Sequence, residues 1–235
     1  MPVRKIPRGR LTVTGSCPAG KSALPAEYES PLERDLFLLL ESEPGVLSFE
    51  PQPLWIEIPG RKKPYPPDVR VEYLNVSEDH HSGQVIVEVK PRRDLWDDWA
   101  KLRRKFKASI HDLAADGIRF KVVTEKEIRT LYARNRAWLR PHLRGPLGVG
   151  ASSILCDVES QPGVTVGSLV EANLRSPVEA GRFLWTIWQC AARGLVEVDL
   201  GDPLSLATQL YPRGFGLPRT HITFPSFRLI KSVFT

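Results

Sequence analysis

The stretch QVIVEVKP, residues 84–91, decides the fold of the chain. β-branched residues make up half of it and a proline ends it, which predicts the clearest strand in the sequence. Alternate side chains of a strand share a face, so Glu88 and Lys90 project together. Val87 and Val89 then point into the opposite layer. A carboxylate and an ammonium group in so apolar a strand cost free energy unless a partner or a function holds them there.

The segments around this strand predict a mixed α/β domain over residues 28–140. A helix is expected to begin at Ser30, because SPLE (30–33) offers a capping serine followed by a proline at the first helical position. The other expected elements are strands at 46–49, 54–58, 68–74 and 118–124, a polar loop at 75–83, and helices at 97–116 and 125–139. Helix, strands, helix, strand and helix, in that order, form a mixed α/β fold.

The regions on either side of this domain differ from it in composition. Residues 1–27 are basic and rich in Pro, Gly and Ser, which favours an extended arm rather than a part of the core. Residues 141–161 begin with Pro and Gly and are expected to form a linker. Within residues 162–235 the patterns predict two helices and a strand, at 165–174, 176–192 and 195–198. This order suggests a small winged-helix-like domain, with a tail, that binds DNA or a partner protein.

The composition excludes several classes of protein. The chain has 235 residues, of which 42% are hydrophobic and 26% charged, and this excludes a disordered, collagen-like or disulfide-stapled chain. Its apolar runs are too short for a membrane span, and no apolar stretch follows the basic residues 1–10 as a signal peptide requires. The cysteines (Cys17, Cys156 and Cys190) are scattered, which fits a reducing cytoplasm and argues against a zinc cluster. A formal charge of +6 is compatible with a polyanionic partner.

Asp68 supplies a second carboxylate for a candidate site. If it lies at the edge of the neighbouring strand, its carboxylate and that of Glu88 converge on one divalent cation. Mg²⁺ suits such a pair, because it takes oxygen ligands at about 2.0–2.1 Å and keeps several waters. The Val89 carbonyl is a third candidate ligand. Lys90 would then orient or deprotonate the attacking water and stabilise charge on a scissile phosphate.

The pattern Asp68…Glu88-Val89-Lys90 resembles the PD-(D/E)xK motif of restriction-endonuclease-like nucleases. With its flanking segments, the series resembles TnsA, the endonuclease subunit of heteromeric cut-and-paste transposases. The segments are GKS (20–22), YESPLERD (28–35), SFEPQP (48–53), PD (67–68), EVKP (88–91) and FKVVTEKEI (120–128). The resemblance covers residues 20–140, and the C-terminal part matches only in its winged-helix-like outline.

This resemblance implies a fold, an activity, a cofactor and partners. The fold is a restriction-endonuclease-like N-terminal domain followed by a small winged-helix-like domain. The activity is Mg²⁺-dependent cutting of the 5′ ends of a transposon in the bacterial cytoplasm, with Mn²⁺ as a substitute metal. A TnsB-like DDE transposase cuts and joins the 3′ ends of the same transposon-end DNA, and a TnsC-like AAA+ ATPase regulates the complex. No membrane is involved.

The resemblance also implies roles for single residues. Glu33 matches the family's helix-borne acidic residue, Asp68 its metal-binding aspartate and Lys90 its lysine. Glu88 stands where the best-known family member has glutamine, so a stronger metal ligand is expected here. Gln52 is expected close to the site. Two other functions stay open: a stand-alone restriction or repair nuclease of the same fold, and a non-catalytic adaptor that bridges DNA and the ATPase.

Each site residue also has a purely structural interpretation. Glu33 can complete a capping box by bonding the Ser30 amide. Asp68 can be a turn residue after two prolines, and Glu88 and Lys90 can form an ion pair on a solvated face. The combination of all four with the flanking segments favours an active site.

A basic run occupies the expected helix at 97–116. It is either the solvated face of an amphipathic helix, with Leu102 and Phe106 facing inward, or a surface that follows a phosphate backbone. The residues concerned are Lys101, Arg103, Arg104, Lys105 and Lys107.

Two other patterns suggest ligands and carry less weight. Residues 15–22 fit the P-loop pattern, but Pro25 follows within a turn and no helix begins before Ser30, whereas a phosphate-binding loop opens directly into a helix. His80 and His81 are adjacent on a polar loop, which favours solvated side chains over a metal site.

Overall fold

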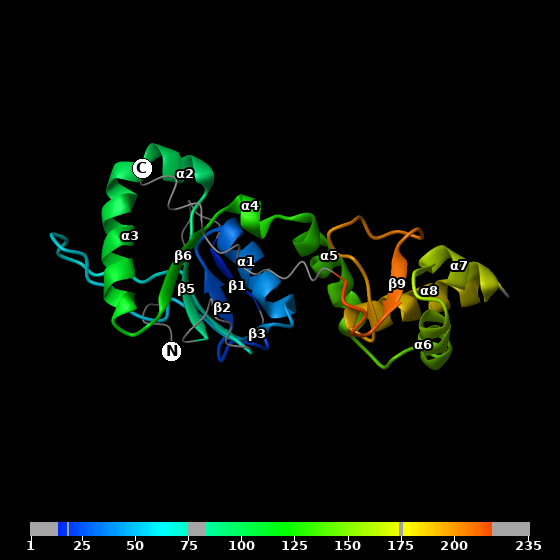
Figure 1. Cartoon of the computed structure of the whole chain (residues 1–235). Helices are drawn as coiled ribbons and strands as arrows, with labels where there is room; N and C mark the ends of the chain where they lie inside the picture. The colour runs from blue at the N-terminus through cyan, green and yellow to red at the C-terminus, as the bar shows by residue number, and fades with distance from the viewer. Residues whose placement is uncertain (1–13, 18, 75–82, 174–175, 218–235) are drawn as a thin grey trace. The chain divides into compact units, whose positions relative to one another are not determined.

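A computed structural model describes residues 14–17, 19–74, 83–173 and 176–217 of the chain (Figure 1). The chain divides into two compact units, the first of which reaches Arg129 and the second of which begins at Thr130. The first unit is a mixed α/β domain with a central sheet and several helices, as the sequence predicts. Within the described ranges, no helix combines the length and the apolar character that crossing a membrane requires.

A four-stranded sheet forms the centre of the first unit, in the order β3-β4-β5-β6. The strands β3 (Val46–Pro51), β4 (Val69–Tyr73) and β5 (Gln84–Val89) pair antiparallel. β6 (Arg119–Val123) pairs parallel with β5, which requires a crossover. The helices α2 (Arg92–Asp97) and α3 (Trp99–Ala114) make this crossover.

The helix α1 (Pro31–Ser42) covers one face of the sheet (Figure 1). Its N-terminus is capped as predicted, since the Ser30 side chain accepts a hydrogen bond from the Glu33 amide. Phe37 is 1% exposed and stacks on Phe49 of β3, with the ring centroids 5.7 Å apart. The same apolar cluster takes in the odd-numbered valines of β5, which are Val85, Val87 and Val89.

The helix α3 covers the opposite face of the sheet (Figure 1). Its buried residues Leu102 and Phe106 pack in one cluster with Ile86 of β5 and Phe120 of β6. Because β5 is an internal strand with a helix on each side, its even-numbered residues Ile86 and Glu88 are as deeply buried as its odd-numbered valines. Glu88 therefore projects into the layer of α3, on the face opposite to Val87 and Val89.

The segment before α1 differs from the predicted extended arm. β1 (Gly15–Cys17) and β2 (Ala26–Tyr28) pair antiparallel, and Cys17 and Ala26 belong to the core cluster beneath α1. The described part of residues 1–27 is thus part of the domain, because these small apolar side chains fill the edge of its core. Residues 1–13, and residues 75–82 of the expected polar loop, lie outside the described ranges.

Two predicted elements of the expected domain at 28–140 are also corrected. Residues 54–58 form a single β-bridge, from Ile56 to Tyr65, and not a strand of the sheet. Their side chains pack with α3 instead. The helix expected at 125–139 is divided into α4 (Glu125–Ile128) and α5 (Leu131–Leu139), because Thr130 caps a new helix start by accepting from the Ala133 amide.

The second unit is a helical domain with a small sheet. After α5 and the 3₁₀ helix η1 (Arg140–Leu143), its elements are α6 (Ala151–Ser160), β7 (Val164–Thr165), α7 (Val166–Ala172), α8 (Pro177–Ala192), β8 (Val196–Glu197) and β9 (Gln209–Pro212). The strands pair antiparallel in the order β7-β9-β8.

The expected linker at 141–161 is therefore wrong for most of its second half, which is α6. Ile154 and Val158 lie one helical turn apart, are fully buried, and share a core cluster with Ile187 of α8. The boundary between the two units falls at Arg129 and not at the expected residue 140.

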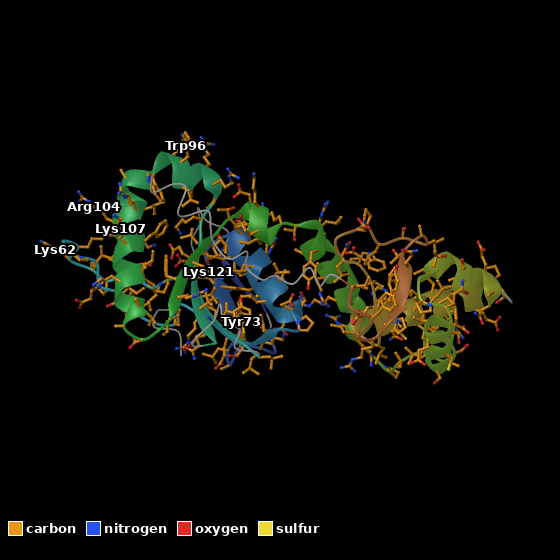
Figure 2. The ribbon with its side chains drawn as sticks, viewed as in Figure 1. Lys62, Tyr73, Trp96, Arg104, Lys107 and Lys121 are labelled. Atoms are coloured by element: carbon orange, nitrogen blue, oxygen red, sulfur yellow. The ribbon has the colours of Figure 1, made fainter. Side chains whose placement is uncertain are left out.

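Phe37 provides a test of this core. Phe37→Ala removes a buried ring and leaves a cavity, so the free energy of unfolding of the first unit should fall by about 3–5 kcal/mol. Urea unfolding followed by circular dichroism measures this change. Trp96→Ala is the control, because the Trp96 side chain is 86% exposed (Figure 2), and its effect should stay below about 0.5 kcal/mol. Equal effects of the two substitutions would contradict the described packing.

Candidate functional site

The register of β4 and β5 brings Asp68 and Glu88 to the same edge of the sheet. Val69 pairs with Val87 in antiparallel register, so Asp68, the residue before Val69, is level with Glu88. One carboxylate oxygen of Asp68, Oδ2, accepts a hydrogen bond of 2.6 Å from the Val89 amide. The main chain of β5 thus fixes the Asp68 carboxylate beside the end of the strand.

Glu88 is the most deeply buried carboxylate of the site, with a side chain only 1% exposed. Its Oε1 lies 3.0 Å from Nζ of Lys90, and it also accepts a hydrogen bond from Nζ of Lys105. Its Oε2 is buried and, among the residues that the structure describes, has no hydrogen-bond partner. The carboxylate is therefore held on one oxygen and free to accept on the other.

Lys90 stands between the two carboxylates. Its Nζ lies 3.9 Å from Oδ2 of Asp68 and donates a 2.9 Å hydrogen bond to the carbonyl of Val89. The Lys90 amide donates to the Val123 carbonyl of β6, which fixes the main chain at this point. Burial alone would lower the pKa of Lys90, but the charges of Asp68 and Glu88 outweigh it and raise that pKa above its ordinary value.

Asp68 has a strongly shifted pKa. Burial, and then the neighbouring charge of Glu88, raise the pKa of its carboxyl from 3.8 to about 8, although Lys90 opposes the shift. A carboxyl with this pKa is largely protonated at neutral pH. A bound cation would reverse this, because it would favour the ionised form of both carboxyls.

Glu33 lies next to this group and is also part of the helix cap. Its Oε1 accepts from the Ser30 hydroxyl at 2.9 Å and its Oε2 from the Glu29 amide at 2.8 Å. The capping-box alternative is thus realised with the amide of Glu29 instead of that of Ser30. Burial raises the pKa of Glu33, and the charge of Lys90 opposes this shift, which places Glu33 within electrostatic reach of the site.

Gln52 follows β3 and contacts the same region. The backbone amide of Gln52 donates a 3.0 Å hydrogen bond to the Asp68 carbonyl. Gln52 therefore lies close to the candidate site, as the family-like segment predicts. Its backbone has φ 44°, a left-handed conformation that costs a non-glycine residue free energy. The Gln52 Oε1 is buried and, within the described ranges, accepts no hydrogen bond.

Lys105 is the site residue whose position sequence reasoning missed. Its side chain is 15% exposed and contacts Glu88, whereas the other four residues of the basic run on α3 are exposed. In Figure 2 the labelled Arg104 and Lys107 lie on the side of α3 away from the sheet. The helical spacing held a signal, since Leu102 and Ser109, three and four residues from Lys105, are both buried. Lys105 thus lies on the buried stripe of the helix.

These residues fit a divalent cation that prefers oxygen ligands. Two carboxylates converge, and one oxygen of Glu88 is buried and has no partner among the described residues. The Val89 carbonyl lies beside them and accepts a hydrogen bond from Lys90. In the part of the chain that the structure describes, no three His, Cys, Asp or Glu side chains form a metal-binding group. Glu33 lies beside the candidate ligands, and both of its carboxylate oxygens accept hydrogen bonds from the residues just before α1.

The alternative ligand patterns receive no support from the structure. The amides of Gly20 and Lys21 donate to the Glu41 carboxylate, at 2.9 and 3.1 Å, so the chain's own carboxylate takes the place that a phosphate would need. The loop also leads into β2 and not into a helix. His80 and His81 lie outside the described residues.

Asp68 predicts a pH dependence of the metal-free protein. Its pKa of about 8 exceeds that of the unfolded chain, so the folded state binds more protons between these values. The free energy of unfolding should therefore fall from about pH 5 to about pH 8, by up to about 1.4 kcal/mol per pH unit for one proton. Asp68→Asn should remove most of this slope, and Glu33 accounts for the remainder.

Urea unfolding in EDTA across this pH range measures the slope for both proteins. Asp116→Asn, a substitution of an exposed aspartate after α3, is the control and should keep the slope of the unsubstituted protein. Parallel slopes for Asp68→Asn and the unsubstituted protein would show that Asp68 ionises normally in the folded state.

Part of the chain matches a known protein family. Residues 43–125 match the family described as TnsA-like endonuclease N terminal. This segment runs from the end of α1 through β6, and it contains Asp68, Glu88, Lys90 and Lys105. No curated protein matches the chain. Residues 43–125 are therefore similar to the N-terminal domain of TnsA-like endonucleases.

Proposed function

We propose that the protein is a Mg²⁺-dependent DNA endonuclease that cuts the 5′ ends of a transposon during cut-and-paste transposition. The observation that carries this proposal is the convergence of Asp68, Glu88 and Lys90 at the end of β5, inside the segment that matches the TnsA-like family. A structural ion pair alone would not require two buried carboxylates that repel each other.

The side chains of Asp68 and Glu88 and the carbonyl of Val89 would hold the metal, with Mn²⁺ as a substitute for Mg²⁺. When bound, such a cation polarises a phosphodiester and makes a water molecule easier to ionise. Two observations support this assignment: Oε2 of Glu88 has no hydrogen-bond partner in the part of the chain that the structure describes, and the pKa of Asp68 is raised. A bound cation would pair with that oxygen and lower that pKa.

Lys90 would act on the substrate as an ammonium group. Since the two carboxylates raise its pKa, it keeps its proton at neutral pH. This favours a role in orienting the attacking water and stabilising charge on the scissile phosphate over a role as a base. Glu33, with both oxygens already hydrogen-bonded, would hold the start of α1 and add negative charge beside Lys90.

The outer side of α3 is a candidate surface for the DNA backbone. It exposes four basic side chains, which are Lys101, Arg103, Arg104 and Lys107. The segment from Ile56 to Tyr65 packs against α3 and exposes three more, Arg61, Lys62 and Lys63. Basic side chains from two adjoining elements support phosphate contacts, and such binding weakens with increasing salt.

We also propose that residues 150–212 form the winged-helix-like domain and that the protein works with partners. Three helices with β7 between the first two, followed by β8 and β9, support the outline, as does their antiparallel order β7-β9-β8. The partners would be a TnsB-like DDE transposase and a TnsC-like AAA+ ATPase, with all three proteins acting on transposon-end DNA in the bacterial cytoplasm. The family match to a TnsA-like domain supports this assignment.

Reconstitution tests the proposed activity. With both partner proteins, Mg²⁺ and DNA that carries a transposon end, Asp68→Asn should lower 5′-strand cleavage by at least about 100-fold, because it removes a charged metal ligand. Lys90→Ala should do the same. Both variants should keep the circular dichroism spectrum and the DNA affinity of the unsubstituted protein.

Asp116→Asn is the matched control for Asp68→Asn, and it should cut normally. Normal cleavage by either site variant would refute the site assignment. Cleavage of arbitrary duplex by the isolated protein would favour the stand-alone nuclease, and assembly on DNA without any cleavage would favour the adaptor.

A further inference from the structure

We propose that Lys105 is a positioning residue for Glu88: its ammonium group holds Glu88 Oε1 in the metal-free protein and sets how strongly a divalent cation must compete for the site. This inference rests on the proposed metal-dependent function. It concerns a residue of α3 that the sequence groups with the basic surface of that helix.

The first argument is the position of the ion pair. Lys105 and Glu88 come from α3 and β5, and their side chains are 15% and 1% exposed. Removing two charges from water is unfavourable unless the geometry of the ion pair and further hydrogen bonds offset the loss of hydration. An ion pair at this depth thus differs from a surface pair such as Arg93 with Asp97 of α2, whose side chains are mostly exposed.

The second argument is that further buried side chains surround the ammonium group of Lys105. Nζ of Lys105 lies 3.8 Å from the centroid of the Tyr65 ring, a cation–π contact. The hydroxyls of Tyr65 and Ser109 are hydrogen-bonded at 2.8 Å, and Ser109 also donates to the Lys105 carbonyl at 2.8 Å. Two further buried side chains are therefore arranged around the position of one lysine.

The third argument is that the two carboxylate oxygens of Glu88 have different surroundings. Lys90 and Lys105 both contact Oε1, and Oε2 is left buried and, within the described ranges, without a partner. The arrangement therefore fixes the orientation of the carboxylate and presents one oxygen for a further cation. The direct contact of Lys105 with the site is to Glu88, whereas Lys90 also contacts the Asp68 side of the site.

The charge balance gives the sign of the effect. Two carboxylates, Asp68 and Glu88, face two ammonium groups, Lys90 and Lys105. If the charge of Lys105 is removed, the site becomes more negative by one unit and attracts cations more strongly. A proton competes for the same carboxylates, but a divalent ion gains twice as much from the lost positive charge. Loss of Lys105 should therefore strengthen divalent binding, although it removes an interaction.

Binding of Mn²⁺ to the full-length protein without DNA tests this inference. Free Mn²⁺ is followed by its electron paramagnetic resonance signal at a pH of about 8, near the pKa of Asp68. Lys105→Met should bind Mn²⁺ about tenfold more tightly, from the removal of one nearby charge. Lys105→Arg keeps the charge and should bind like the unsubstituted protein. Lys126→Met, which removes an exposed charge on α4, is the control and should have no effect.

Tighter Mn²⁺ binding by Lys105→Met is a result that damage to the fold would not produce. If Lys105→Met bound Mn²⁺ with unchanged or weaker affinity while its circular dichroism spectrum stayed normal, the inference would be overturned. If Lys105→Met failed to fold, a Lys105→Arg protein that bound several-fold more tightly or more weakly than the unsubstituted one would overturn it. Failure of the proposed function looks different: the unsubstituted protein itself would not bind Mn²⁺, or Asp68→Asn would bind it equally well.

Discussion

The carboxylate of Glu88 is buried in the first unit, and the positions of the side chains around it depend on this buried charge. A buried charge without partners is not tolerated, so ammonium groups must reach it from two elements. Lys90 comes from the same strand and Lys105 from the helix above it. The helix α3 packs on this face of the sheet, and the Tyr65 ring covers the ammonium group of Lys105.

The two faces of β5 carry different kinds of side chain: one face is apolar and the other includes the charged Glu88. The odd-numbered valines pack under α1 with Phe37 and provide apolar burial. The even-numbered positions face α3, where Ile86 is apolar and Glu88 is charged. The antiparallel partner β4 adds Asp68 at the same level, and the Val89 amide fixes its carboxylate. The register of these two strands thus places Asp68, the residue before β4, and Lys90, the residue after β5, beside Glu88.

Local signals were sufficient for most elements and for the central site residues. The strand at 84–89, the serine-capped α1, and the adjacency of Glu88 and Lys90 follow from periodicity and capping, which depend on neighbours in sequence. Contacts between distant segments were not predictable in this way. Residues 54–58 pack on α3 instead of pairing in the sheet, and Cys17 and Ala26 belong to the core. Lys105 points inward because its ammonium group contacts Glu88 and the Tyr65 ring. The apolar spacing in α6 was present in the sequence, but the Pro and Gly that precede it obscured it.

The most direct measurement of the central claim is a crystal structure of the full-length protein soaked in Mn²⁺, with diffraction recorded at the manganese absorption edge. The account predicts an anomalous peak bonded to one carboxylate oxygen of Asp68 and to Oε2 of Glu88, with Lys105 still beside Oε1. Manganese bound elsewhere, with both carboxylates still turned to the lysines at saturating Mn²⁺, would contradict it.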